Sequence, residues 1–193
     1  METKHIQEFF DSRAAHWDET CHHDPRRMAA VASLAQIHPG DRVLDIACGT
    51  GVFIPELLAR EPSLVLGVDF SPEMIRIAKE KFHDPRVQLE AIDLFDVEET
   101  SFDVATIYSA YPHFLDKEKL VKKLFSLLRP GGRFLIAHSE SRETINSRHH
   151  QGAQAVSIPL RPVQEESKVW ETHFQLDILV DTEEFYLLSG VKK

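Results

Sequence analysis

The sequence predicts an α/β fold built on a doubly wound parallel sheet, because short apolar strands alternate with amphipathic helices and a glycine turn follows the first strand. Strands are predicted at 42–46, 64–68 and 87–92, with helices at 52–60 and 72–82 between them. Repeated β–α units of this length place their strands in parallel and join them by right-handed crossovers. The turn Gly49-Thr50-Gly51 lets the backbone come close to a ligand before the next helix begins.

The chain before the first strand is predicted to be helical. An apolar and largely aromatic face recurs at helical spacing over residues 3–18, formed by Ile6, Phe9, Phe10, Ala14 and Trp17. A second helix is predicted over 25–36 and ends before His38-Pro39-Gly40.

The second half of the chain continues the alternation and then changes. A fourth strand is predicted at 102–108, a helix at 117–128, a turn at 129–132 and a fifth strand at 133–137. After these, residues 142–156 are predicted to be helical, 157–168 to be a proline-interrupted connection, and 174–180 and 185–190 to be two strands. The spacer 181–184 between them is short enough for a hairpin.

Length and composition predict one domain and exclude several kinds of partner. A chain of 193 residues that is 42% hydrophobic is long enough for one domain with a full core. We divide this domain into residues 1–38, 39–140 and 141–193. A net charge of −9 disfavours nucleic acid as a substrate. Because the sequence has neither the apolar core of a signal peptide nor a run long enough to span a bilayer, we expect a cytoplasmic protein that does not bind membranes. Two cysteines make no disulfide framework, so both are expected to be reduced thiols.

Asp45 indicates which nucleoside cofactor the glycine turn accepts. A dinucleotide site places pyrophosphate at such a turn, and a carboxylate four residues before Gly49 would repel it. A cationic ligand without phosphates is therefore favoured. S-adenosylmethionine fits, since its sulfonium and ammonium groups are positive while its ribose and adenine still need a nucleoside pocket.

The residues Asp45-x-Ala47-x-Gly49-x-Gly51 closely resemble the first motif of class I S-adenosylmethionine-dependent methyltransferases, with Ala47 where the family often has glycine. The resemblance covers residues 39–140 by motif and the C-terminal hairpin by pattern. It implies a Rossmann-like seven-stranded sheet whose last strand is antiparallel, with the segment before residue 39 as an N-terminal helical lid. The segments 21–25, 111–114 and 137–142 resemble a subgroup of small bacterial-type methyltransferases.

Acidic residues at two strand ends are candidates for binding the nucleoside, because ligands of doubly wound sheets lie outside the carboxyl ends of the strands. Asp69 closes the second strand about 20 residues after the glycine turn, where a carboxylate accepts from both ribose hydroxyls. The alternative role, a helix cap, is already filled by Ser71 before Pro72. Asp93 resembles the family's acidic residue that accepts from the adenine amino group, although a plain surface turn is an alternative.

The remaining cofactor residues follow from the same placement. Phe70 and Met74 are expected to flank the adenine, and the Leu94 amide is expected to bond a ring nitrogen. The segment from Tyr108 to Tyr111 resembles the segment of the methyltransferase family that passes the methionine portion and the methyl group of the cofactor. Asp45 would act there through its charge or a bridging water, while Gly49 and Gly51 let the backbone approach.

The acceptor site is suggested by the placement of several of the 11 histidines. His113, His138 and His149 are the candidates for a general base, because the fold brings their segments to the carboxyl ends of the strands. Metal ligation is an alternative, with His22, His23, His138, His149 and His150 as candidate ligands beside Cys21 and Asp24. The spacing matches no standard zinc pattern, and a lone histidine is most often a surface or packed core residue.

The sequence as a whole predicts an S-adenosylmethionine-dependent methyltransferase that acts on a small-molecule acceptor. The acceptor atom is left open among a thiol, a hydroxyl, an amine and a soft inorganic centre, and so is the oligomeric state. A non-catalytic S-adenosylmethionine-binding regulator or scaffold is the alternative, although a pure binder needs no titratable residues in its cavity. A nicotinamide-dependent reductase is opposed by Asp45 and by Ile54 at the third fingerprint position.

Overall fold

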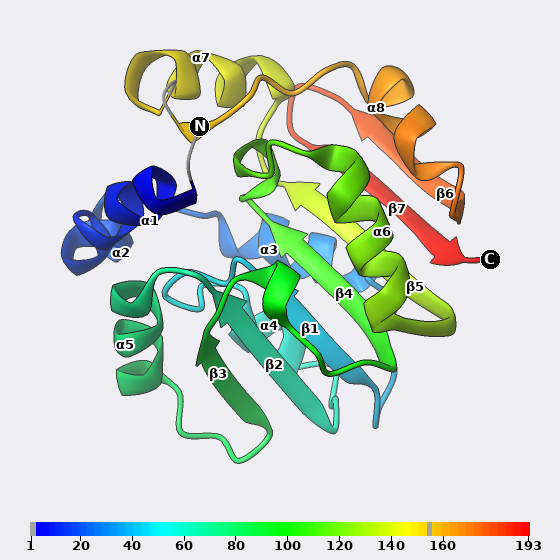
Figure 1. The fold of residues 1–193 in the computed structure, drawn as a ribbon, viewed down its shortest axis with the longest axis horizontal. Coiled ribbons are helices and arrows are strands. Elements are labelled where there is room, and N and C mark those ends of the chain that lie inside the picture. The colour runs from blue at the N-terminus through cyan, green and yellow to red at the C-terminus, as the bar shows by residue number, and fades with distance from the viewer. Residues whose placement is uncertain (1–2, 154–155) are drawn as a thin grey trace.

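The computed structural model describes residues 3–153 and 156–193, and a seven-stranded sheet runs through them in the order β3-β2-β1-β4-β5-β7-β6 (Figure 1). The strands are β1 (Arg42–Ile46), β2 (Leu64–Asp69), β3 (Val87–Ala91), β4 (Phe102–Tyr108), β5 (Leu128–His138), β6 (Phe174–Asp181) and β7 (Tyr186–Lys192). The pairs from β3 to β5 are parallel, and β7 runs antiparallel to both of its neighbours. The predicted doubly wound sheet with an antiparallel last strand is confirmed.

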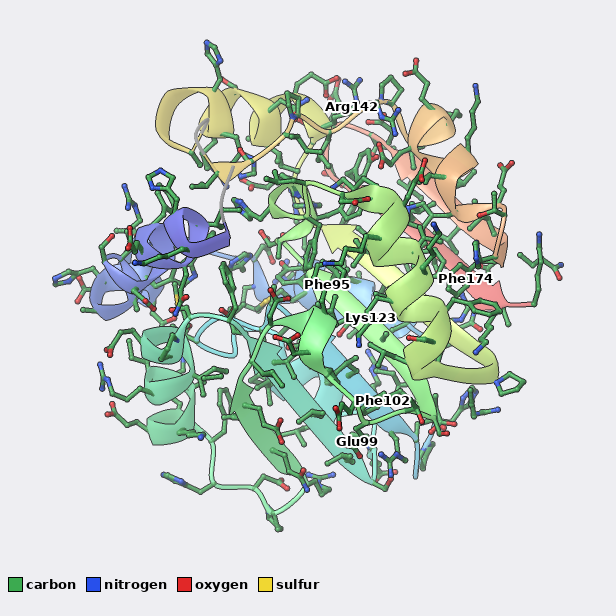
Figure 2. The ribbon with its side chains drawn as sticks, in the orientation of Figure 1. Phe95, Glu99, Phe102, Lys123, Arg142 and Phe174 are labelled. Atoms are coloured by element: carbon green, nitrogen blue, oxygen red, sulfur yellow. The ribbon has the colours of Figure 1, made fainter. Side chains whose placement is uncertain are left out.

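Helices cover both faces of the sheet because its central strands are apolar on both sides. One face carries α3 (Pro25–Leu34), α4 (Ile54–Leu58) and α5 (Pro72–Lys81), while α6 (Lys117–Leu127) and α8 (Val163–Trp170) pack on the other (Figure 1). Lys123 of α6 donates to the carbonyl of Phe95 at 3.1 Å, and Figure 2 labels both residues. That bond fixes α6 to the loop that follows β3.

The N-terminal helix is interrupted, so the prediction of one continuous helix over 3–18 is wrong. It forms α1 (Thr3–Asp11), a 3-10 turn (Ala14–His16) and α2 (Trp17–Thr20). The break has a local cause: the Ser12 hydroxyl and the Arg13 guanidinium both donate to the carbonyl of Phe9, at 2.9 and 3.0 Å. These side chains take the acceptor that the next turn of helix would use, and the chain bends back toward the sheet.

Two further differences lie in the C-terminal third. The predicted connection 157–168 contains the start of α8, whose Val163 and Trp170 are fully buried after Pro162 at the N-cap. Strand β5 begins at Leu128 rather than at 133, and the predicted turn appears as a shift in its pairing with β4. The helix predicted over 142–156 is α7 (Arg142–Gly152), and part of its predicted end lies outside the described residues.

The described helices include none long and apolar enough to cross a membrane. The carboxyl ends of β1, β2 and β4 point toward α1 and α2, and α7 lies beyond the end of β5 (Figure 1). Residues from these segments therefore meet at one edge of the sheet.

Candidate functional site

A cavity of about 700 Å³ lies at this edge, between the strand ends, the N-terminal helices α1 and α2, and α7. The residues after β1, β2 and β3 form one half of its wall, which we call the cofactor half: Ala47, Cys48, Gly49, Thr50, Asp69, Phe70, Met74, Asp93 and Leu94. The other half, the acceptor half, comes from distant segments: Phe10, Trp17, Cys21, His22, His23, Tyr108, His113, Phe114, Glu140, Arg148 and His149.

The predicted glycine turn follows β1 and has left-handed backbone angles. Ala47, Gly49 and Gly51 adopt positive φ angles of 52°, 56° and 86°. A Cβ at Gly51 would lie 2.4 Å from a ring carbon of Phe82, so this glycine allows the turn to pack on α5. Ala47 and Gly49 line the cavity, whereas Gly51 lies behind it.

Asp69 joins the two turns of the cofactor half. Its Oδ2 accepts from the Gly49 amide and its Oδ1 from the Ser71 amide, both at 2.9 Å. Burial raises the pKa of this carboxyl to about 6, against the lowering effect of the two amides. An ionised carboxylate oxygen accepts more than one hydrogen bond, so Asp69 can receive further donors from the cavity. Ser71 caps α5 by accepting from the Met74 amide, as the sequence indicates.

Asp45 is placed differently from the other predicted cofactor residues. It lies on β1 beneath the turn, is 1% exposed and does not line the cavity. Thr106 donates to its Oδ1 at 2.8 Å, while its Oδ2 has no hydrogen-bond partner among the described residues. Burial raises its pKa to about 7, and the Thr106 hydrogen bond only partly offsets this effect. Its predicted electrostatic role stays a prediction.

The other predicted nucleoside residues line the cavity together. Met74 is buried at the start of α5, next to the turn that carries Phe70. Asp93 accepts from the Phe95 amide at 3.0 Å and so caps the turn after β3, which is the alternative role weighed for it. The cap uses Oδ1, which leaves Oδ2 for a donor in the cavity.

Tyr108 ends β4 and connects the halves of the cavity. Its ring stacks on Phe53 at 4.5 Å, with an angle of 11° between the planes. Its hydroxyl lies 2.8 Å from the Ser139 hydroxyl and 3.1 Å from His23 Nδ1. Burial raises the pKa of this phenol to about 12, so Tyr108 stays protonated at neutral pH.

His113 and His149 form a pair in the acceptor half, with their ring centroids 5.1 Å apart. The Nδ1 atom of His113 lies 3.0 Å from the Val156 carbonyl, which can only accept, so this nitrogen carries the proton. The Nε2 atom of neutral His113 is then an acceptor. Burial lowers the pKa of His113 to about 4 and also lowers the pKa of His149. Phe10 packs edge-on against His113 at 4.9 Å.

The remaining histidines are less closely grouped. His138 is 2% exposed and lies behind the wall, and burial lowers its pKa to about 3. Its Nε2 has no partner within the described part of the chain. His22 and His23 line the cavity, whereas His150 does not. In residues 3–153 and 156–193, no three His, Cys, Asp or Glu side chains are grouped to hold a metal ion, and metal binding stays a prediction.

An ion pair in the acceptor half was not predicted from the sequence. Arg148 donates to both carboxylate oxygens of Glu140, at 2.5 and 2.7 Å. Glu140 lies two residues after the end of β5, and Arg148 lies directly before His149 on α7. These positions next to predicted site segments are the only sequence signal that could have identified the pair. The pair is neutral as a unit, and the other two charged residues at this side of the cavity, Asp116 and Lys119, are one acid and one base, so this side has no excess of either charge apart from its titratable histidines.

Comparison with known proteins identifies the family. Residues 37–186 match the family model described as a methyltransferase domain. The chain belongs to this family. That match covers strands β1 to β6, helices α4 to α8 and the whole cofactor half of this methyltransferase, and it confirms the resemblance seen in the first motif.

The relatives of the methyltransferase include enzymes named for quinone biosynthesis. It is 32% identical over 119 residues to the ubiquinone/menaquinone biosynthesis C-methyltransferase UbiE of Geotalea daltonii, covering 58% of this chain and 51% of that protein. It is 34% identical over 117 residues to the demethylmenaquinone methyltransferase of Deinococcus radiodurans, covering 58% and 47%. The aligned part thus spans about half the length of these relatives.

Solved structures of low identity share the fold. The putative methyltransferase in complex with the Haloferax volcanii Trm112 methyltransferase activator has a TM-score of 0.78 at 19% identity, over 95% of this chain and 97% of that one. Phosphoethanolamine N-methyltransferase 2 of Haemonchus contortus, in complex with S-adenosyl-L-methionine, has a TM-score of 0.74 at 17% identity, over 97% and 60%. These likenesses confirm the class I methyltransferase fold.

Proposed function

We propose that this methyltransferase transfers the methyl group of S-adenosylmethionine to a small, uncharged acceptor held between the lid helices and α7. One observation carries the proposal: a single cavity has the family's turns and carboxylates on one side and neutral imidazoles on the other. When bound, the cofactor supplies an electrophilic methyl group on a sulfonium. The chain supplies binding, alignment and an acceptor for the proton.

The cofactor half fits the nucleoside through groups that are already held in place. Asp69 would receive the ribose hydroxyls at its remaining lone pairs, since its carboxylate is fixed by two backbone amides. The free oxygen of Asp93 would receive the adenine amino group, with the Leu94 amide beside it. The turn from Ala47 to Gly49 would take the methionine end.

In the acceptor half, we assign His113 as the residue that orients the acceptor and receives its proton. Its Nε2 is the unprotonated nitrogen, and its low pKa keeps the ring neutral across the physiological range. A hydroxyl, thiol or amine of the substrate would donate to this nitrogen. His149 lies beside it, with its ring tilted by 48°, and is the second candidate, while His138 lies behind the wall and would act only through its neighbours.

The acceptor is proposed to be planar and organic. The relatives are named for the biosynthesis of ubiquinone and menaquinone. In this chain, Phe10, Trp17 and Phe114 give the acceptor half aromatic walls that suit a ring, and the Glu140–Arg148 pair leaves no charge to attract an ion. We further propose that residues 1–38 act as the lid, 39–140 as the cofactor core and 141–193 as the C-terminal part, in a cytoplasmic protein that uses neither nucleic acid nor a membrane as partner.

The proposal is tested with the purified chain, S-adenosylmethionine and a panel of planar hydroxyl, thiol and amine acceptors. We expect release of S-adenosylhomocysteine with at least one aromatic acceptor, and release that is slower by roughly a hundredfold or more with His113→Gln. Calorimetry provides the second test: S-adenosylhomocysteine should bind more tightly than NAD. Tighter binding of NAD would overturn the cofactor assignment, and cofactor binding without turnover on any acceptor would favour the regulator or scaffold.

A further inference from the structure

Two carboxylates of the lid helices bond the same two turns that form the cofactor half. Asp18 of α2 accepts from the Thr50 hydroxyl at 2.5 Å, inside the glycine turn. Asp11, the last residue of α1, accepts from the Ser71 hydroxyl at 2.5 Å, at the start of α5. The lid therefore holds both sides of the nucleoside site through its own acids.

These contacts form a continuous chain around the site. Asp69 links the two turns by accepting from the amides of Gly49 and Ser71. Each turn then donates a hydroxyl outward to the lid, Thr50 to Asp18 and Ser71 to Asp11. Any ligand that fixes Asp69 and its two turns also fixes the positions of both hydroxyls.

The Asp18 contact is supported by a cation. Lys81, at the end of α5, lies 2.8 Å from Asp18 Oδ2, while Thr50 occupies Oδ1. Burial disfavours the charge on Asp18, but the hydrogen bonds from Lys81 and Thr50 outweigh it and lower the pKa of this carboxyl. The acid thus stays ionised at neutral pH and is a strong acceptor for the Thr50 hydroxyl.

An aromatic residue directly before each of the two acids covers the cavity. Phe10 and Trp17 both line it, and their rings are 5.6 Å apart. Phe10 also reaches Phe70, which follows Asp69, with 6.2 Å between ring centroids. The cover over the cavity is therefore anchored at each end by a carboxylate bonded to a cofactor turn.

We propose that Asp11 and Asp18 are positioning residues that couple closure of the lid helices to occupancy of the nucleoside site. Since the lid and the ligand order the same turns, each stabilises the state that the other prefers, and the coupling is reciprocal. The inference rests on the proposed use of S-adenosylmethionine. It adds that the affinity for the cofactor depends on two side chains that do not line the cavity.

The first measurement is the affinity for S-adenosylhomocysteine by calorimetry on the full chain. Asp18→Ala and Asp11→Ala should each weaken binding by about three- to tenfold, the size expected for a charge-assisted contact that is partly open to water. Asp18→Asn keeps an oxygen that faces Thr50 and should recover most of the loss. Glu19→Ala is the matched control, because Glu19 lies on the same helix and its carboxylate pairs with the exposed His16.

A double-mutant cycle separates coupling from a loss of structure. Thr50→Val removes the hydroxyl at nearly constant volume, and combining it with Asp18→Ala should weaken binding no more than the worse single variant. Thermal melting of each variant shows whether it is folded. Additive losses would mean that Asp18 does not act through Thr50, and they would overturn the proposal.

Trypsin cleavage provides a readout that a purely structural contact would not change. Arg13 is exposed at the break between α1 and the 3-10 turn, so cleavage there reports opening of the lid. S-adenosylhomocysteine should slow this cleavage in the wild type and in Glu19→Ala, but not in Asp18→Ala or Asp11→Ala. Equal protection and equal affinity in all variants would overturn the inference alone, whereas a wild type that does not bind S-adenosylhomocysteine would overturn the proposed function and this inference with it.

Discussion

The cofactor half and the acceptor half of the cavity are built from different kinds of structure. In the cofactor half, backbone amides and the carboxylate of Asp69 hold two turns that follow directly from β1 and β2. In the acceptor half, side chains from α1, α2, α7 and the segment after β4 meet although they lie up to 139 positions apart in the sequence, from Phe10 to His149. The first half depends on local geometry, and the second depends on how distant segments pack.

That difference has a chemical counterpart. Burial raises the pKa of Asp69, in the cofactor half, to about 6 and the pKa of Asp45, beneath its glycine turn, to about 7. In the acceptor half, burial instead lowers the pKa of His113 to about 4. The same physical effect, the cost of burying a charge, thus favours the neutral form in both halves. A neutral acid keeps its proton, whereas a neutral imidazole is ready to accept one.

Removing the lid helices should have the largest effect, because it should abolish the function of the acceptor half while the cofactor half still binds its ligand. Deletion of residues 1–20 removes Phe10 and Trp17 from the acceptor half but leaves the sheet and the turns after β1 and β2. We expect turnover to fall by about a thousandfold or more, because the acceptor loses its walls and water enters. The core should still melt cooperatively and bind S-adenosylhomocysteine, with reduced affinity. Full activity of the truncated chain would show that the lid takes no part in the acceptor half.

Replacing His113 tests the chemistry of the acceptor half alone. His113→Gln should lower kcat by roughly a hundredfold or more, as expected for loss of a positioned base, and should change the affinity for S-adenosylhomocysteine less than about twofold. His83→Gln, an exposed histidine beyond α5, is the control. An unchanged kcat would move the role of base to His149.

The pH dependence of the same reaction sharpens this assignment. An ordinary imidazole would make the rate rise with pH between about 6 and 7. Because burial lowers the pKa of His113 to about 4, its base form is already complete well below that range. The rate that depends on His113 should therefore be flat from pH 6 to 8 and fall only as the pH approaches 4. A step near 6.5 would show that a group other than His113 acts as the base.

Ligand binding in the cofactor half should depend strongly on one carboxylate, that of Asp69. Asp69→Ala should weaken binding of S-adenosylhomocysteine by about 2 to 4 kcal/mol, since it removes a charged acceptor for two hydroxyls. Cys48→Ala, at the same turn, removes no such acceptor and should change binding much less. Calorimetry measures both variants, and circular dichroism checks that the fold survives. Equal affinities in the two variants would contradict the ribose role of Asp69.

Sequence patterns predicted the cofactor half well because its structure is local. The strand, glycine turn and acidic strand end follow one another along the chain, and Ala47, Gly49 and Asp69 indeed line one wall. The break after Asp11 was missed, because the competition of Ser12 and Arg13 for one carbonyl is invisible to a periodic pattern. Helix α8 was hidden by prolines that flank its start rather than interrupt it.

The acceptor half was predicted only as a gathering of histidines, and the roles of those histidines depend on tertiary contacts. The sequence gives no sign that a carbonyl fixes the tautomer of His113, or that His138 lies behind the wall while His22 lines it. Asp45 illustrates the same limit on the other side. Its place in the motif indicated a charge near the ligand, but its burial and its Thr106 partner follow from the pairing of β1 with β4.

The smallest expected effect is on the pH dependence of the free energy of unfolding. A buried acid beneath the cofactor half and a buried histidine behind the acceptor half contribute to it with opposite signs. Asp45 has a folded pKa of about 7, above its value of 3.8 in the unfolded chain, so the folded state binds more protons and loses stability as the pH rises toward 7. His138 has a folded pKa of about 3, below its unfolded value of 6.5, so the unfolded state binds more protons below 6.5 and stability is lost as the pH falls. The two contributions oppose each other between pH 5 and 7.

Single variants should therefore change the pH slope of stability in opposite directions. In Asp45→Asn, the free energy of unfolding should rise more steeply from pH 5 to 7 than in the wild type, by about 1 to 2 kcal/mol over the interval. In His138→Gln, it should rise less steeply by a similar amount. Urea unfolding at pH 5, 6 and 7 measures both slopes against the wild type. Each pKa shift comes from burial of the ionisable group. Parallel slopes in all three proteins would therefore mean that water reaches Asp45 and His138. The contrast between the buried acid under the glycine turn and the buried base under the acceptor half would then be wrong.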